Sequence, residues 1–455
     1  MQRRWFGTDG IRGKAGDEPL TVPFLTRLGQ VLGEQARADA PAEGPALALL
    51  ARDTRESGPE IARALAQGMA AEGLRVVDLG VVPTAGMPLA MRQDDAALGL
   101  VISASHNPWQ DNGVKVFGRG GLKLPDAVEA AVESRLESMG HKPLPLDLPP
   151  PRTRDGATAY CEEMLARFGG LDLSGMNLAV DCAHGSASTT APRVLLELGA
   201  SITPMAHRPD GRNINEDCGS THMGTLAARV TADGFDLGLA FDGDADRVLM
   251  VDGQGRFCTG DHMLGFLGPW LASRGELPGD TVVATVMSNL GLQRHMGAAG
   301  LELLRTPVGD RHVLAAMIEG GFGLGGEDSG HLILPHHGHL LGDGLLTALL
   351  VLSGLRETGR DLVSVVDAVA KVPQVLLNVP VASRPPLDEL PRVNALVAAA
   401  EAAHGDDIRI VLRYSGTEAL ARVMVEGMDA GVVERTSEEL AELWRAEIET
   451  HGSGA

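Results

Sequence analysis

The chain has 455 residues, which at about 100–150 residues per domain corresponds to three or four domains. Hydrophobic residues make up 44% and charged residues 22%, a balance that is typical of a folded globular protein and excludes long disordered regions. The formal charge of −21 excludes nucleic acid and anionic membranes as expected partners, because both would be repelled.

Three segments of the chain repeat one order of elements. Each has an apolar strand, a polar turn, a helical stretch, a second strand, and an apolar run that leads into a polar loop. The opening strands of the three segments are expected at 46–51, 177–181 and 281–287. The polar loops that close them are SASHNP (103–108), DGDADR (242–247) and GEDSGH (326–331).

Short apolar runs that alternate with helical stretches predict buried parallel strands joined by crossover helices. We therefore expect an α/β protein with three similar domains of mixed or parallel sheets and a smaller C-terminal α+β domain. Ligands bind beyond the carboxyl ends of strands in open α/β sheets, so the three polar loops should meet at one central cleft.

Changes in composition indicate the domain boundaries. A Pro-rich stretch at 142–154 interrupts both helix and strand and predicts the first linker. A new helical pattern near 260 and an alternating pattern after 371 indicate the other two. The expected domains are 1–150, 151–254, 255–368 and 369–455.

The first polar loop carries a candidate nucleophile. Residues 103–118 contain two serines, a histidine and a lysine, with Asn-Pro and Asp-Asn-Gly turns. Ser105 is the best nucleophile in this loop, because His106 and Lys115 could supply a base or positive charge. Taken alone, this pattern also fits a plain polar turn.

The second polar loop predicts a metal site. Asp242, Asp244 and Asp246 follow an apolar run and would repel one another unless a cation neutralised them. A calcium EF-hand is excluded, because its sixth position would be Arg247 and its twelfth Gly253. Mg²⁺ is favoured, since it binds few carboxylates and completes its shell with phosphate oxygens. We expect this loop to lie outside the hydrophobic core.

Three glycine-containing segments carry groups suited to a sugar phosphate, although each also fits a structural turn. Segment 326–331 offers hydrogen bonds to sugar hydroxyls from Glu327, Ser329 and His331. Segment 412–418 suits a phosphate through Arg413, Ser415, Gly416 and Thr417. Segment 6–13 presents Arg12 to a phosphate.

The remaining histidines and cysteines do not predict further sites. The cluster of His336, His337 and His339 lacks carboxylate partners at metal-ligand spacing, so we expect a surface loop. Four widely spaced cysteines without a C-x-x-C pair indicate a reducing compartment. No signal peptide and no apolar run of about 18 residues is recognisable, so we expect a cytoplasmic protein.

Together these motifs, in this order and across essentially the whole chain, resemble the α-D-phosphohexomutase superfamily. FGTDGIRG, GVKVF, PVGDR (307–311) and RVMVEG (422–427) resemble its glucosamine-phosphate branch. The resemblance implies an enzyme, an isomerase that interconverts the 6- and 1-phosphates of glucosamine and supplies UDP-N-acetylglucosamine synthesis. Phosphomannomutase or phosphoglucomutase activity is the alternative.

The resemblance also implies the roles of single residues. Ser105 would carry the phosphoryl group, and one Mg²⁺ per chain would be held by that phosphoserine with Asp242, Asp244 and Asp246. His106 and Arg247 would stabilise the phosphate, and a sugar 1,6-bisphosphate would be the activator. The sugar phosphate would be bound by Asp310, Arg311, Glu327, Ser329, Arg413, Ser415, Gly416 and Thr417. The proton acceptor is left open among Lys115, Arg12 and His331, and a homodimer is compatible with the sequence.

Three positions depart from the branch pattern. His312 replaces an aromatic residue and Ala419 replaces a proline, and both changes are expected to affect local backbone shape. Asp328 stands where glutamine is commoner, so its charge would either favour an amino sugar or face solvent.

Overall fold

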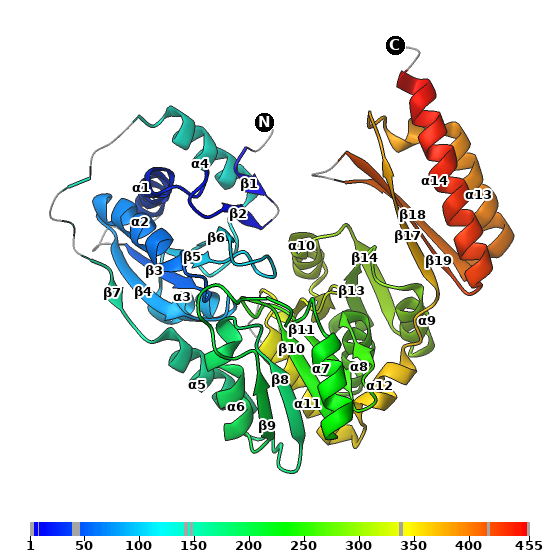
Figure 1. Cartoon of the computed structure of the whole chain (residues 1–455), viewed down its shortest axis with the longest axis horizontal. Coiled ribbons are helices and arrows are strands. Elements are labelled where there is room, and N and C mark those ends of the chain that lie inside the picture. The colour runs from blue at the N-terminus through cyan, green and yellow to red at the C-terminus, as the bar shows by residue number, and fades with distance from the viewer. Residues whose placement is uncertain are drawn as a thin grey trace.

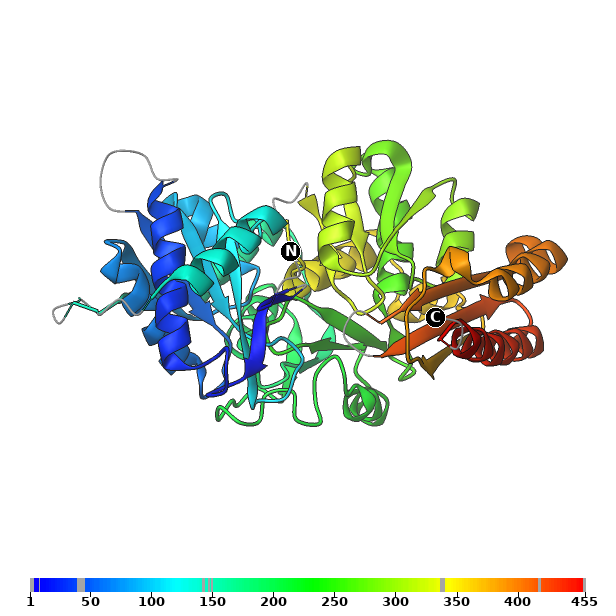
Figure 2. The ribbon, with the colours of Figure 1, turned by 90° about the horizontal axis from the view of Figure 1, so that it is seen from above.

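The computed structural model describes residues 4–7, 9–38, 46–140, 144–145, 148, 150–335, 340–415 and 419–452. Within these residues, four sheets and their helices follow one another along an arc (Figure 1), and from above the second and third units lie between the first and the fourth (Figure 2). The expected fold class is confirmed: three related α/β units precede a smaller α+β unit. None of the described helices is long and apolar enough to cross a membrane.

The first sheet has seven strands in the order β1-β2-β6-β5-β3-β4-β7. Its strands are β1 (Phe6–Gly7), β2 (Gly10–Lys14), β3 (Leu47–Arg52), β4 (Arg75–Val81), β5 (Leu98–Ile102), β6 (Asp111–Gly118) and β7 (Arg152–Thr153). One face packs against α1 (Val22–Ala38), α2 (Gly58–Ala71) and α4 (Asp126–Ser138). The other face packs against α3 (Gly86–Asp94) and α5 (Gly156–Phe168).

The second and third sheets are smaller. The second, in the order β12-β11-β10-β8-β9, contains β8 (Asn177–Asp181), β9 (Ser201–Met205), β10 (Leu237–Phe241), β11 (Val248–Asp252) and β12 (Phe257–Cys258), with α6 (Ala191–Glu197) and α7 (Gly224–Asp233). The third, in the order β14-β13-β15-β16, contains β13 (Thr281–Thr285), β14 (Glu302–Thr306), β15 (Leu324–Gly326) and β16 (Leu332–Ile333). The helices that accompany it in sequence are α8 (Gly260–Ser273), α9 (Leu290–Ala298), α10 (Asp310–Gly320), α11 (Gly344–Thr358) and α12 (Leu362–Ala368).

The threefold repeat expected from the sequence is confirmed by strand pairing. The opening strand of each unit (β3, β8, β13) pairs in parallel with two neighbours. The second of these neighbours (β5, β10, β15) then pairs antiparallel with the next strand in sequence. The three polar loops connect these antiparallel pairs, so they leave equivalent strand ends.

Helix α11 holds the second polar loop from behind. It is apolar on nearly every side and buried along most of its length. The helix begins at Asp343, whose carboxylate accepts the Leu346 N–H at 3.0 Å and the Tyr160 hydroxyl at 2.7 Å. The N–H of Gly344, in its first turn, donates to the carbonyl of Ala245 at 3.0 Å. The acidic loop therefore rests on the start of a rigid buried helix.

One continuous apolar core joins the first three units and includes Leu49, Val180 and Leu349. The fourth unit has a separate core around Trp444. Its antiparallel sheet consists of β17 (Gln374–Pro380), β19 (Leu420–Gly427) and β18 (Ile408–Tyr414), accompanied by α13 (Pro391–His404) and α14 (Ala430–Gly452). Because apolar burial is the main stabilising term in folding, the first three units depend on one another.

Candidate active site

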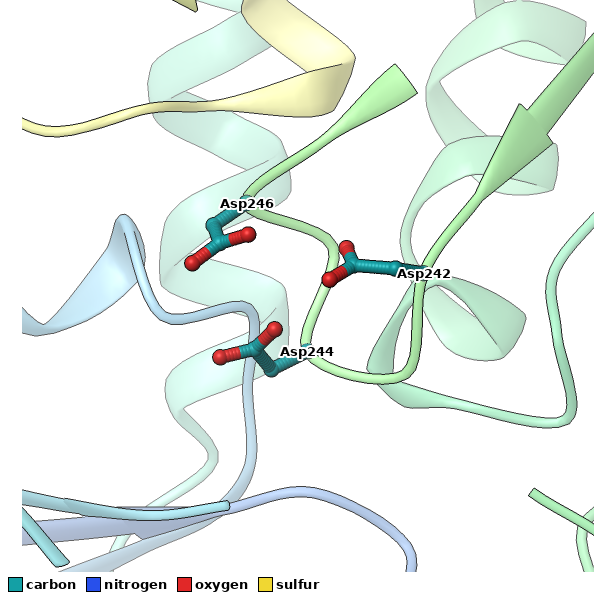
Figure 3. A group of neighbouring side chains, drawn as sticks. All are labelled: Asp242, Asp244 and Asp246. Carbon is teal, nitrogen blue, oxygen red and sulfur yellow. The ribbon is translucent and has the colours of Figure 1, made fainter. Parts of the chain in front are cut away.

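The acidic loop between β10 and β11 brings three carboxylates together. Asp242, Asp244 and Asp246 each place an oxygen within 4.8 Å of the others (Figure 3). Asp242 and Asp244 are completely buried. The expectation that this loop lies outside the core is therefore wrong. The first polar loop, residues 103–108 (the serine loop), and the start of α11 enclose it.

Ser105 lies against this loop although 137 residues separate it from Asp242. Its Oγ donates a hydrogen bond to Asp242 Oδ2 at 2.6 Å and lies 3.4 Å from His106 Nδ1. The approach depends on Gly243, since a Cβ there would lie 2.6 Å from the Ser105 carbonyl oxygen. The fold thus brings the predicted nucleophile and the predicted metal ligands to one place.

Lys115, on β6, neutralises part of the acidic charge. Its Nζ lies 2.8 Å from Asp244 Oδ2, 3.0 Å from Asp246 Oδ2 and 3.1 Å from Asp9 Oδ2. Burial alone would lower the pKa of Lys115, but these carboxylates hold that pKa well above its usual value. The ammonium group is therefore charged at neutral pH.

Asp242 and Asp246, in the acidic loop, have pKa values shifted in opposite directions. Burial raises the pKa of Asp242 well above its usual value, and the neighbouring Asp246 and Asp244 raise it further. Burial would also raise the pKa of Asp246, but Lys115 and His331 hold it well below. Asp244 Oδ1 and Asp246 Oδ1 are buried without a hydrogen-bond partner among the described residues. The cluster thus has two buried acceptor atoms that protein donors do not satisfy, which is compatible with a bound cation.

A cleft of about 430 Å³ opens beside the cluster. It is lined by residues of the first three units: Trp5, Gly7, Asp9, Gly10, Arg12, His106, Asp246, Arg247, Val308, Gly309, Asp310, Glu327 and His331. Seven of these were predicted as site residues, namely Arg12, His106, Asp246, Arg247, Asp310, Glu327 and His331. The cleft therefore combines side chains of both charges beside a serine hydroxyl.

The two cleft histidines have different environments. His331 Nε2 accepts the Gly342 N–H at 3.1 Å, and its Nδ1 lies 3.5 Å from Asp246 Oδ1. Burial would lower the pKa of His331, but Asp246 and Asp310 raise it. His106 is shifted the other way, because burial and the nearby Arg247 and Arg12 lower its pKa.

Lys123 pairs with two residues of the cleft lining and was not identified from the sequence. Its Nζ bridges Asp9 Oδ1 at 2.6 Å and Asp310 Oδ2 at 2.5 Å, and so joins the first unit to the third at the cleft. Asp9 in turn accepts a hydrogen bond from Arg12 Nη2 at 2.7 Å. Lys123 belongs to no motif, and its partners are 114 and 187 residues away, so no local pattern could identify it.

Two predicted sugar-binding residues do not line the cleft. Arg311 points to α4, where Nη1 lies 2.6 Å from Asp126 Oδ1 and Nη2 lies 3.8 Å from Glu129 Oε1. Ser329 is half-buried outside the cleft lining, and its Oγ has no hydrogen-bond partner among the described residues.

Asp328 neither faces the cleft nor stands free in solvent. Its oxygens lie 2.8 and 2.9 Å from Lys371 Nζ, and it also accepts the hydroxyl proton of Thr259, just before α8. The idea that its charge selects an amino sugar is therefore not supported. Its contacts instead join the loop at residues 326–331 to the linker before β17.

The predicted phosphate-binding segment belongs to the fourth unit. Arg413 on β18 and the buried Ser415 do not line the cleft. Of the other predicted residues, Gly416, Thr417, His336, His337 and His339 lie outside the described residues.

Comparison with known families matches all four units. The description phosphoglucomutase/phosphomannomutase applies to residues 3–142 (alpha/beta/alpha domain I), 158–255 (domain II), 259–372 (domain III) and 376–443 (C-terminal domain). The chain belongs to this family. The expectation of a phosphohexomutase, an isomerase, is confirmed.

Individual relatives carry more specific names than the family description. A phosphoglucosamine mutase from Frankia alni is 44% identical over 451 residues, covering 98% of this chain and 99% of the relative. One from Rhodospirillum rubrum is 44% identical over 438 residues, covering 95% and 96%. A solved phosphoglucomutase/phosphomannomutase family protein from Burkholderia thailandensis shares the fold, with a TM-score of 0.80, 24% identity and 97% of each chain covered.

Proposed function

We propose that this chain interconverts glucosamine 6-phosphate and glucosamine 1-phosphate through a phosphorylated Ser105. The observation that carries the proposal is the 2.6 Å contact between Ser105 Oγ and Asp242, beside a cleft lined by Arg12 and Arg247. The substrate follows from relatives at 44% identity whose name is phosphoglucosamine mutase.

The acidic loop fits Mg²⁺. Three carboxylates meet there, and two of their buried oxygens have no hydrogen-bond partner among the described residues. Asp242, Asp244 and Asp246, with a phosphate oxygen on Ser105, would hold the ion. When bound, it would neutralise charge on the phosphoryl group during transfer.

The proposed reaction has two transfers. A hydroxyl of the sugar monophosphate attacks the phosphorus of phosphoserine, the bond to Ser105 Oγ breaks, and the hydroxyl proton passes to a base. The serine oxygen takes up a proton as it leaves. The resulting 1,6-bisphosphate then reorients and Ser105 Oγ attacks the phosphorus of its other phosphate. The P–O bond to the sugar breaks, the sugar oxygen takes up a proton, and the serine hydroxyl proton passes to the base. Arg247 and His106, both at the cleft, would stabilise the transferred group.

The geometry limits which residues can accept the hydroxyl proton. Lys115 is held charged by three carboxylates, so it contributes positive charge rather than a free base. His331 and Arg12 both line the cleft, but the Arg12 guanidinium also stays protonated, so His331 is the candidate for moving the proton.

The remaining roles follow the four units. We propose that domain 1–150 carries the phosphoserine and that domain 151–254 binds the metal. Domain 255–368 would bind the sugar, and domain 369–455 would bind the phosphate that is not being transferred. Arg413, Ser415, Gly416 and Thr417 would bind that phosphate, while Glu327 and Asp310, which line the cleft, would contact the sugar. A cytoplasmic location and activation by a sugar 1,6-bisphosphate complete the proposal.

The first test is sugar preference. We expect kcat/KM for glucosamine 6-phosphate to exceed that for glucose or mannose 6-phosphate by more than about tenfold, because a single charged contact to the amine is worth about 1.5–3 kcal/mol. Glu327, whose Oε1 accepts the Gly309 N–H at 3.2 Å, is the best placed acceptor. Glu327→Gln should therefore reduce the preference. Equal kcat/KM for the three sugars would contradict the assignment.

A second test separates Asp328 from specificity. Because its carboxylate pairs with Lys371, Asp328→Gln should leave the ratio of kcat/KM between the amino and neutral sugars unchanged within about twofold. The melting temperature should fall slightly, since a half-exposed ion pair contributes at most about 1 kcal/mol. A change in the ratio as large as that of Glu327→Gln would return Asp328 to the sugar site.

A further inference from the structure

The conformation of Ser105 is imposed by contacts outside the cleft. Its φ is +52°, in the left-handed region, which is unfavourable for a residue with a side chain. Such a conformation persists only where surrounding contacts fix the peptide groups on both sides of the residue. For Ser105 these contacts converge on the turn after β3, the first turn of the threefold repeat.

Arg55, in that turn, binds the serine loop through its whole guanidinium group. Nη2 donates to the carbonyls of Ser105 at 3.0 Å and Asn107 at 2.8 Å. Nη1 donates to the carbonyls of Pro108 and of Asp111, the latter at 2.9 Å. Nε donates to Asp53 at 2.9 Å, so all five N–H donors of arginine are used.

The same ion pair also fixes the amide of Ser105. Asp53 Oδ2 accepts the Ser103 hydroxyl proton at 2.6 Å, and Ser103 Oγ accepts the Ser105 N–H at 2.9 Å. Asp53, Arg55 and Ser103 are all at most 1% exposed, so water does not compete for these bonds. The N–H and the C=O of Ser105 are therefore both tied to the Asp53–Arg55 pair.

A second residue reaches the loop from the second unit. Asn215 Nδ2 donates to the carbonyl of Ser105 at 2.9 Å and to that of Asn107 at 3.0 Å. These are the two carbonyls that Arg55 Nη2 also binds. The serine loop is thus bound by side chains of both the first and the second unit.

We infer that Arg55 is a positioning residue for phosphoryl transfer: it holds the strained backbone of Ser105 so that Oγ faces the acidic loop, with Asn215 as its partner across the unit boundary. The inference rests on the proposed role of Ser105. Arg55 does not line the cleft, so it acts through the loop and not on the sugar phosphate. Lysine could not replace it, because three donors on one nitrogen cannot serve five acceptors.

The test is Arg55→Lys, with Arg52→Lys as the matched control. Arg52 lies three residues earlier and pairs with Asp78 away from the serine loop. We expect Arg55→Lys to lower kcat by about 10- to 100-fold with KM within about twofold, because a small displacement of a reacting group has effects of this size. Hydrogen exchange of the 103–111 peptide should accelerate, while Arg52→Lys changes neither quantity.

Asn215→Ala provides a second variant if Arg55→Lys does not fold. It should lower kcat several-fold and accelerate exchange in the same peptide. Unchanged kcat in a folded Arg55→Lys, or unchanged exchange of the 103–111 peptide, would overturn the inference, as would unchanged kcat in Asn215→Ala. A wild-type protein that does not turn over sugar phosphates would instead contradict the proposed function, and the exchange result would still report on the anchoring of the loop.

Discussion

Replacing Ser105 with alanine is expected to lower mutase turnover by about 10³-fold or more and to remove covalently bound phosphate, because the reaction then lacks its nucleophile. Intact-mass analysis with site mapping measures the phosphate, and a coupled assay measures turnover. Folding should be preserved, since the hydroxyl contacts the polar groups of Asp242 and His106 rather than the apolar core.

Ser103→Ala is the matched control, because Ser103 differs in position by only two residues. Its hydroxyl binds Asp53 and the Ser105 N–H, so it cannot reach the cleft. We expect a milder loss, of about tenfold, with phosphate still present on Ser105. Phosphate mapped to Ser103, or the opposite ranking of the two variants, would contradict the assignment of the nucleophile.

Replacing Asp244 with asparagine should weaken Mg²⁺ binding and slow transfer by about 10- to 100-fold. A neutral ligand offsets less of the cation's charge, while Lys115 keeps Asp246 and Asp9 as partners. Calorimetric titration with Mg²⁺ measures the affinity, and removal of metal by a chelator should stop turnover of the wild-type protein.

The control for this variant is Asp233→Asn. Asp233 lies at the end of α7 in the same unit, where it pairs with Arg229 on the surface. That change should alter neither Mg²⁺ affinity nor turnover. If Asp244→Asn retained both the affinity and the metal dependence of the wild type, the acidic loop would not be the metal site.

Local patterns in the sequence were sufficient for the fold and for the centre of the site. The repeated order of strand, turn, helix and loop predicted three sheets with equivalent connections, and strand pairing confirms it. The same repeat placed Ser105, Asp242 and Glu327 at corresponding strand ends. The structure brings Ser105 and Asp242 into contact and places Glu327 in the adjacent cleft.

What the sequence did not predict depends on distant contacts. Lys123 is connected to the cleft only through Asp9 and Asp310, and Arg55 acquires its partners only when the serine loop folds over it. Arg311 and Asp328 are the opposite case, because their motifs suggested a role in the cleft that their side chains do not have. Both belong to motifs with other residues that line the cleft, but the Arg311 side chain pairs with Asp126 and the Asp328 side chain pairs with Lys371. The position of a residue in a motif indicates where its backbone lies, whereas the direction of its side chain depends on which charged groups lie nearby.

The shared apolar core has a consequence for how such a chain can be divided. The three related units look like separable modules in sequence, yet Leu49, Val180 and Leu349 belong to one buried cluster. Cutting the chain between the first two units would expose leucine and valine side chains on both fragments, at about 25 cal/mol for each Å² of apolar surface returned to water. The first unit also has a second core around Leu28 and Leu65, and the fourth unit has a core around Trp444 that shares no residue with the joint cluster. The repeat is thus a unit of sequence and topology, while one shared apolar cluster runs through all three copies.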